Sequence, residues 1–291
     1  MMMKPQADKL TRKAYAKINL GLDVVGRLEN GYHQVRMIMQ TVGIYDRLTF
    51  AAGESGIRIV TDSGELPTGP DNLIYRAAVL LLETCGVEAG VDIRLEKHIP
   101  IAAGMAGGSS DAAATLQGLN DLFALGLTQE RLRQLGVRIG ADVPYCIMGG
   151  TALAEGIGEV LTTLPPAPRC TVLVARPDLQ VSTKYVYEHL DAGEFWQHPD
   201  IDGMRSAIES GSLPGVVSRL GNVLETVTAG AYPVIGQIKR EMLTRGAMGS
   251  LMSGSGPTVF GIYGNREQAR DARSRLEETG LAKELFVTEF V

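Results

Sequence analysis

The chain has 291 residues, with 28 basic and 33 acidic side chains and a formal net charge of −5 at pH 7. This acidic balance argues against general binding of nucleic acids or membrane surfaces, because both require a positive field. Hydrophobic residues make up 45% and charged residues 21%, as is usual for a soluble globular protein, and the length suggests about two domains.

The three cysteines, Cys85, Cys146 and Cys170, are odd in number, widely spaced and without a C-x-x-C pair, which indicates reduced thiols. The N-terminal sequence MMMKPQADKLTRKAY lacks the apolar segment of a signal peptide, and the aliphatic runs are only a few residues long. We therefore expect a cytoplasmic protein with neither a membrane nor a nucleic-acid partner.

The first half of the chain predicts strands followed by helices. Ala14 to about Val60 is strand-like, with turns at 29–31 and 52–53, and Asn30-Gly31 is typical of a hairpin because both residues tolerate a positive φ. Further elements are predicted as a helix over Asn72–Cys85 closed by Gly86, a strand over Val91–Lys97, and helices over Ser109–Ala124 and Gln129–Val137.

The segment LPPAPR, residues 164–169, predicts a domain boundary because its three prolines stiffen the chain and disfavour helix. The predicted domains are thus residues 1–163 and 164–291. The second half predicts several helices, including Pro233–Thr244 and Arg266–Glu278, and strands at Cys170–Ala175, Gly249–Met252, Thr258–Tyr263 and Glu284–Phe290. Helices and strands occur in both halves, so the class combines α and β structure.

The strongest chemical signal is the segment PIAAGMAGGSSDAAA, residues 100–114, which lies between a predicted strand and a predicted helix. Small residues let a ligand approach the backbone, and the N–H groups at a helix start favour an anion, so the segment is suited to binding phosphate. The alternative is a tight turn in which a serine caps the helix and Asp111 only offsets the helix dipole.

Other phosphate-binding, nucleophile and metal motifs fail. No lysine follows Gly108 as a Walker loop requires, and Asp111 stands where a nucleophile elbow needs glycine. The four histidines, His33, His98, His189 and His198, have no metal-ligand spacing, so no protein metal ligand is predicted.

Three weaker signals accompany the phosphate-binding segment. Met252–Thr258 is rich in glycine and suits either a plain hairpin or a second wall of a polyphosphate site. Lys17 and Asn19 share one face of a strand, where the lysine is either an edge residue or a site residue. Asp142 lies in a short apolar stretch and suits either an Asx-turn or helix cap, or a proton acceptor, which phosphoryl transfer to a hydroxyl requires.

Three segments in this order resemble the motifs of the GHMP kinases: AKINL at 16–20, P-x-x-x-G-x-x-G-G-S-S at 100–110 and MSGSGPT at 252–258. The resemblance covers essentially the whole chain. The pattern G-R-x-x-x-G-Y-H at 26–33, together with GADVPYC at 140–146, is similar to one branch of this family. Members of that branch use ATP to phosphorylate the 2-hydroxyl of a cytidine diphosphate-linked methylerythritol in non-mevalonate isoprenoid biosynthesis.

The resemblance implies an α+β, two-domain fold. It consists of an N-terminal mixed β/α domain and a C-terminal ferredoxin-like α/β sandwich, with the active site in the cleft between them. It also implies ATP as the phosphoryl donor, with Mg²⁺ expected on the nucleotide. The oligomeric state is left open.

The resemblance further assigns roles to individual residues. Asp142 is implied as the general base and Lys17 as its partner. The ATP-binding residues are implied to be Pro100, Ile101, Ala102, Ala103, Gly104, Met105, Ala106, Gly107, Gly108, Ser109 and Ser110. The substrate-binding residues are implied to be Asn19, Tyr32, His33, Thr183, Tyr187, Gly254, Ser255 and Gly256, with Tyr32 and His33 on the cytosine.

The loop of this family often carries more glycine and a leucine, whereas residues 102–106 of this chain read Ala-Ala-Gly-Met-Ala. Alanine restricts φ but leaves the backbone open, so we expect no loss of function. Two alternatives stay open: another GHMP kinase, of the mevalonate or homoserine type, or a non-catalytic module that binds nucleotide or RNA. The GYH segment disfavours the first, and the negative charge disfavours RNA.

Overall fold

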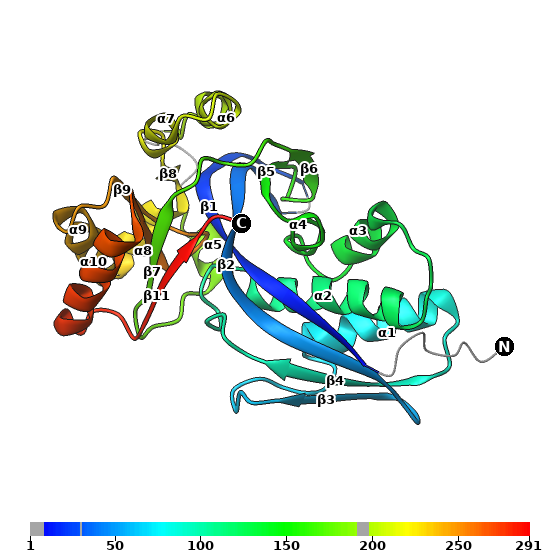
Figure 1. Cartoon of the computed structure of the whole chain (residues 1–291). Helices are drawn as coiled ribbons and strands as arrows, with labels where there is room; N and C mark the ends of the chain where they lie inside the picture. Colours follow the sequence, from blue (N-terminus) through cyan, green and yellow to red (C-terminus); the bar gives the residue numbers. More distant parts are fainter. Residues whose placement is uncertain (1–8, 30, 191–197) are drawn as a thin grey trace. The chain divides into compact units, whose positions relative to one another are not determined.

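The computed structural model describes residues 9–29, 31–190 and 198–291, which form two compact units (Figure 1). Unit 1 contains the chain up to Ala16 together with Ile44–Ile101 and Ala106–Gly149. Unit 2 contains Lys17–Gly43, Ala102–Met105 and Gly150–Val291. The boundary expected between residues 163 and 164 refers to continuous stretches of sequence and stays a prediction.

Two long strands, β1 (Leu10–Arg27) and β2 (His33–Gly53), contribute residues to both units. In the turn between them, the Leu28 N–H donates to the Tyr32 carbonyl at 2.7 Å, and the Gly31 N–H donates to the Leu28 carbonyl at 2.9 Å. The expected strand–turn–strand unit is confirmed, although Asn30 lies outside the described residues. The strands belong to a seven-stranded sheet in which β3-β4-β2-β1-β8 are successive neighbours, β5 pairs with β2, and β6 pairs with β5.

Unit 1 packs helices on one face of its strands (Figure 1). Its further elements are β3 (Ile57–Thr61), α1 (Leu73–Cys85), β4 (Gly90–Glu96), α2 (Gly107–Leu122), α3 (Gln129–Val137) and α4 (Val143–Met148). Strand β4 runs parallel to β3 and antiparallel to β2, with Ile93 opposite Phe50. The buried side chains of these strands form one core with α1 and α2, and that core fixes where α2 begins.

Unit 2 contains an antiparallel four-stranded sheet in the order β11-β7-β10-β9. Its elements are β5 (Thr151–Glu155), β6 (Val160–Thr163), β7 (Thr171–Arg176), α5 (Thr183–Glu188), α6 (Ile201–Glu209), α7 (Leu213–Val217), β8 (Gly221–Asn222), α8 (Leu224–Ala231), α9 (Val234–Thr244), β9 (Gly249–Met252), β10 (Val259–Tyr263), α10 (Arg266–Thr279) and β11 (Glu284–Glu289). Taken as β7, α9, β9, β10, α10 and β11, these elements follow the β-α-β-β-α-β order of a ferredoxin-like sandwich, as expected.

Several local predictions are confirmed by their hydrogen bonds. Asn72 caps α1 by accepting the Ile74 N–H at 2.8 Å, and Gly86 ends that helix with a left-handed φ of 62°. Thr128 caps α3 as expected. Helix α2, however, begins at Gly107, two residues before the predicted start, and its N-cap residue Ala106 makes no side-chain capping bond.

Candidate active site

The start of α2 in unit 1 overturns the prediction that a serine caps this helix. Ser109 and Ser110 lie inside the first turn, and the Ser110 hydroxyl donates to the Tyr15 carbonyl at 2.6 Å. The N–H groups of a first turn have no partner within the helix, and they carry its positive dipole end. The N-terminus of α2 therefore suits an anion, and the binding of phosphate by this segment stays a prediction.

The loop before α2 carries backbone strain. Ala102 and Ala106 have φ values of 52° and 57°, in the left-handed region that alanine rarely adopts. Such a conformation costs on the order of 1 kcal/mol per residue, and strain of this kind gathers at ligand sites, where the surroundings enforce it.

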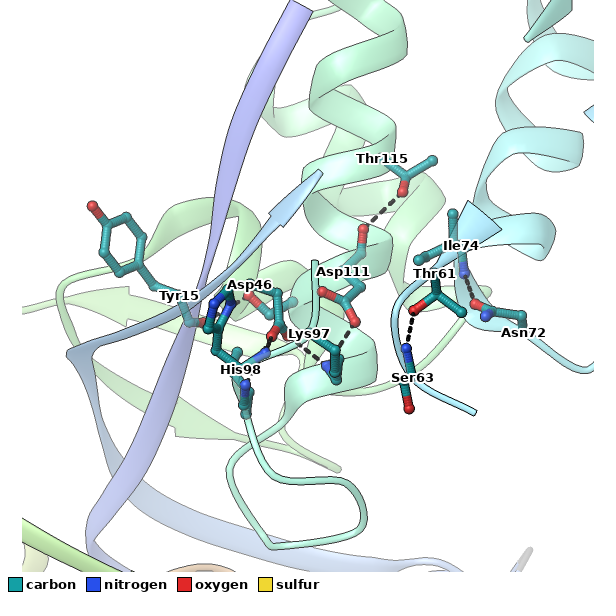
Figure 2. Close-up of polar contacts among 12 residues, drawn as sticks. Tyr15, Asp46, Thr61, Ser63, Asn72, Ile74, Lys97, His98, Asp111 and Thr115 are labelled. Carbon is teal, nitrogen blue, oxygen red and sulfur yellow. Dashed lines mark hydrogen bonds and ion pairs between the residues drawn. The ribbon is translucent and has the colours of Figure 1, made fainter. Parts of the chain in front are cut away.

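A buried charged cluster lies behind this loop in unit 1. Figure 2 shows Lys97 between Asp46 of β2 and Asp111 of α2, with its ammonium in contact with both carboxylates; the Asp111 pair measures 2.9 Å. The side chains of Asp46, Lys97 and Asp111 are 0%, 7% and 4% exposed. Asp111 is therefore held in a buried ion-pair cluster, and its role is not limited to complementing the dipole at the helix surface.

The shared ammonium sets the protonation of this cluster. Burial raises the pKa of Asp111 to about 8, against the attraction of Lys97 and with a further increase from the Asp46 carboxylate. Burial lowers the pKa of Lys97, but Asp111 and Asp46 outweigh that effect and raise it. The raised pKa of Lys97 keeps its ammonium charged at neutral pH, and Asp111 takes up a proton more readily than an exposed aspartate does.

In unit 2, Lys17 and Asn19 lie together on β1, as their spacing predicted. The Lys17 ammonium donates to Asn19 Oδ1 at 2.8 Å, and both residues are buried. The Asn19 amide also donates to Met37 Sδ at 3.2 Å. A buried ammonium is suited to stabilise an anion that develops beside it.

The glycine-rich segment at 252–258 forms the connection of the β9–β10 hairpin and contacts the loop around Gly104. Ser253 Oγ donates to the Gly104 carbonyl at 3.0 Å and accepts from the Asn19 N–H at 3.3 Å. Gly104 has a φ of 74°, and a Cβ there would lie 2.4 Å from the Ser253 carbonyl oxygen. Within unit 2, therefore, three of the segments that the sequence singled out meet.

Side chains from two helices and one short strand hold the hairpin connection in place. The Asn222 amide donates to the Met252 and Gly254 carbonyls, both at 2.8 Å. The Thr228 hydroxyl donates to the Ser255 carbonyl at 3.1 Å, and the Thr183 and Ser255 hydroxyls lie 2.9 Å apart. Thr183, Gly254, Ser255 and Gly256 thus lie close together, as the prediction of a shared substrate wall requires.

His33 and Tyr187, both expected near the cytosine, stack on each other with ring centroids 4.9 Å apart. Burial, and next the Arg27 guanidinium, lower the pKa of His33 and favour its neutral form. Tyr32, beside it, has 60% of its surface exposed. These rings suit an uncharged base, and their role in binding one stays a prediction.

Asp142 stands at the N-cap position of α4 in unit 1, where its carbonyl accepts the Cys146 N–H at 3.0 Å. Its side chain makes no capping hydrogen bond to that helix. The alternative that Asp142 serves as a simple helix cap is therefore wrong. The pairing of Asp142 with Lys17, which belongs to the other unit, stays a prediction.

Residues 9–29, 31–190 and 198–291 contain no group of three or more His, Cys, Asp or Glu side chains arranged to hold a metal ion. Of the helices in those same ranges, none combines the length and the apolar character that crossing a membrane requires.

Sequence reasoning missed Asp46, Lys97, Ser253 and Asn222. Lys97 is the last residue of a predicted strand and stands three residues before Pro100, a place from which it could reach the loop. Asp46 is the one acidic residue in strand β2, which is a weak signal of a buried pair. Nothing in the sequence links Asn222 to a loop 30 residues later.

Comparison with known proteins gives two family matches. Residues 72–150 match the GHMP kinase N-terminal domain, and residues 199–281 match the GHMP kinase C-terminal domain. A 4-diphosphocytidyl-2-C-methyl-D-erythritol kinase of Lachnospira eligens is 53% identical over 283 residues, which is 97% of this chain and 98% of the relative. The protein of that name in Caldicellulosiruptor bescii is 50% identical over 277 residues, 95% of this chain and 96% of the relative.

Solved structures agree at the level of the fold. The crystal structure of a 4-(cytidine 5′-diphospho)-2C-methyl-D-erythritol kinase is 34% identical with a TM-score of 0.83, over 97% of this chain and 99% of that one. Homoserine kinase from Cytophaga hutchinsonii has a TM-score of 0.79 at 20% identity, over 99% of this chain and 96% of that one. The second likeness concerns the fold alone.

Proposed function

This chain belongs to the GHMP kinase family, and from that premise we propose that it phosphorylates 4-diphosphocytidyl-2-C-methyl-D-erythritol. The reaction transfers the terminal phosphoryl group of ATP to the 2-hydroxyl and gives the 2-phosphate and ADP, a step of non-mevalonate isoprenoid precursor synthesis. The observation that carries this proposal is the identity of 53% over almost the full length of a kinase with that name.

On the donor side, residues 100–110 supply the binding site for the ATP phosphates. The support is the uncapped N-terminus of α2 and the strained, side-chain-poor backbone before it. Helix N–H groups bind phosphate oxygens without a lysine of the Walker type. Mg²⁺ comes with the nucleotide and neutralises phosphate charge, and no side chain of this protein is assigned to it.

On the acceptor side, Asp142 accepts the hydroxyl proton and Lys17 stabilises the charge on the attacking oxygen. Phosphoryl transfer needs a positioned nucleophile and charge neutralisation, and these two side chains supply both. The support for Lys17 is its burial and its bond to Asn19. For Asp142 the support is its place in the GADVPYC motif, at the residue that precedes helix α4.

The cytidine group binds against the stacked rings of His33 and Tyr187 and beside Tyr32, with Asn19, Thr183 and residues 254–256 along the remaining substrate. The support is the ring stack of His33 on Tyr187 and the contact between the Thr183 and Ser255 hydroxyls. A neutral imidazole can both stack on a base and hydrogen-bond to its edge.

The test is ATP consumption with Mg²⁺ and three alcohols offered in parallel: 4-diphosphocytidyl-2-C-methyl-D-erythritol, mevalonate and homoserine. Turnover is expected with the first alone, and cytidine diphosphate should compete with it. Turnover with mevalonate or homoserine instead would overturn the substrate assignment and leave the kinase family intact.

A paired variant tests the general base. Asp142→Asn should reduce kcat by at least about a thousandfold while ATP binding measured by calorimetry persists. Asp271→Asn, an exposed aspartate of α10, is the matched control and should retain wild-type kcat. Near-normal turnover in Asp142→Asn would contradict the assignment of the base.

A further inference from the structure

The buried cluster of Asp46, Lys97 and Asp111 in unit 1 has no part in the phosphoryl-transfer chemistry proposed above. Its members come from three places in the sequence: strand β2, the residue after β4, and the second turn of α2 (Figure 2). Two carboxylates and one ammonium at this depth are costly to bury, so the cluster by itself is weak evidence of net stabilisation. Its distinguishing feature is the set of backbone segments that it connects.

Asp46 holds the segment that enters the phosphate loop, defined here as Pro100–Ala106. Its Oδ1 accepts the His98 N–H at 2.5 Å and the Ile99 N–H at 2.8 Å, and its Oδ2 accepts the Lys97 ammonium. Three consecutive residues before Pro100 are thus bound to one fully buried carboxylate. An apolar side chain at position 46 would remove the acceptor of both N–H groups, and the Ile99 N–H is buried.

Lys97 extends this hold to the helix that follows the loop. Its ammonium donates to Asp111 Oδ2 at 2.9 Å, and a Cβ placed on Gly107 would lie 3.1 Å from its Nζ. The lysine therefore lies against the first residue of α2. An ammonium is repelled by the positive end of a helix dipole, and the two carboxylates offset that repulsion.

We propose that Asp46, Lys97 and Asp111 brace the phosphate loop by tying the chain before it to the helix after it. They act as positioning residues for the nucleotide, and none of them needs to touch it. A loop whose two ends are fixed loses less conformational entropy when it binds a ligand. The role in nucleotide affinity rests on the kinase function proposed above, whereas the role in fixing the loop does not.

Two substitutions at one position separate the brace from simple burial. Asp111→Asn keeps an oxygen that accepts from the Lys97 ammonium, whereas Asp111→Ala removes the contact between Lys97 and helix α2. Arg58→Met, which removes an exposed ion pair with Asp92 in the same unit, is the control. Each protein is studied without ligand by amide hydrogen exchange, followed peptide by peptide, and by calorimetric titration with ATP and Mg²⁺.

In Asp111→Ala, exchange should accelerate in the peptide over residues 98–106 and stay at the wild-type rate in strand β7. The Kd for ATP should rise on the order of tenfold to a hundredfold, since small displacements of positioning groups have effects of this size. The KM for the alcohol should stay unchanged, and Asp111→Asn and Arg58→Met should resemble the wild type in every readout.

If Asp111→Ala does not fold, Lys97→Gln, which removes the charge that joins the two carboxylates, is put through the same measurements.

Unchanged hydrogen exchange over residues 98–106 in Asp111→Ala would overturn the proposal of a brace. Exchange that accelerates equally in strand β7 would also overturn it. Equal behaviour of the asparagine and alanine variants would also overturn it. If the wild-type protein does not bind ATP at all, the proposed function fails, and the exchange data still decide whether the cluster fixes the loop.

Discussion

The phosphate loop and the β9–β10 hairpin connection are each anchored by a carboxylate paired with a lysine, and the two pairs differ in how deeply they are buried. Before the phosphate loop, Asp46 accepts backbone N–H groups with one oxygen and the Lys97 ammonium with the other. Before the hairpin connection, Glu225 accepts the Met252 N–H at 2.8 Å with one oxygen and the Lys239 ammonium with the other. The first pair is 0% and 7% exposed, and the second is 16% and 23% exposed.

The difference teaches how each loop keeps its shape. The hairpin connection bends at Gly254 and Gly256, which adopt positive φ freely, and the neutral amide of Asn222 holds its carbonyls. The phosphate loop bends at Gly104 and also at Ala102 and Ala106, and alanine does not adopt a positive φ freely. A strained backbone needs a stronger hold, and deeply buried charges supply one because solvent and salt screen them little.

The largest effect expected from this comparison is the loss of the deeper anchor. Asp46→Asn should lower the free energy of unfolding by about 3–5 kcal/mol, because it breaks a buried ion pair from one side. Glu225→Gln, at the more exposed anchor, should lower the free energy of unfolding by about 1 kcal/mol or less, and salt at about 1 M should make this loss smaller still. Denaturant unfolding measures both, and equal losses would contradict the role given to depth.

A second prediction concerns Gly104, where the backbone approaches Ser253. Gly104→Ala should cost about 3 kcal/mol, because left-handed alanine alone costs about 1–2 kcal/mol and its Cβ would collide with a carbonyl oxygen. Gly280→Ala shares the positive φ, 66°, but meets nothing within 4 Å, so it should cost only about 1 kcal/mol. Thermal unfolding of the two variants compares them, and a similar loss in both would mean that the close approach does not matter.

The third prediction is a pH dependence confined to the deeper anchor. Because the folded-state pKa of Asp111 is raised to about 8, the folded protein keeps a proton that the unfolded chain loses above its ordinary pKa near 4. The contribution of Asp111 to stability therefore falls as pH rises from about 4 to about 8, by at most about 1.4 kcal/mol per pH unit. Asp111→Asn should remove this fall, which midpoints of unfolding between about pH 5 and pH 7.5 would show. If the stability of Asp111→Asn changed with pH in the same way as that of the wild type, Asp111 would not be the source of the pH dependence.

The smallest effect is expected where the strain itself is relieved. Ala106→Gly should stabilise the protein by about 0.5–1 kcal/mol, since it removes a left-handed alanine at some cost in chain entropy. Ala124→Gly, at a φ of 50° just after α2, is the matched control and should gain as much. Only Ala106→Gly should raise the KM for ATP, because only that residue precedes the phosphate-binding turn. A destabilised Ala106→Gly would show that the alanine is not strained.

Local sequence signals predicted local structure well. The cap at Asn72, the left-handed Gly86 and the turn before Tyr32 were readable because each depends on residues adjacent in the chain. The start of α2 was predicted two residues late, because a serine in a first turn has the composition of a cap. Its hydroxyl instead donates to Tyr15, which lies 95 residues away in sequence.

The sequence by itself determined the class of the fold, the positions of the glycine-rich loops and the family of the chain, since motif order and turn chemistry are written in contiguous residues. Only the tertiary structure decided that Asp46 and Lys97 hold the phosphate loop, that Ser253 contacts Gly104, and that His33 stacks on Tyr187. The physical reason is that a buried charge or a close backbone contact takes its meaning from its partner. In this protein those partners lie 51 to 154 residues apart, where no local pattern connects them.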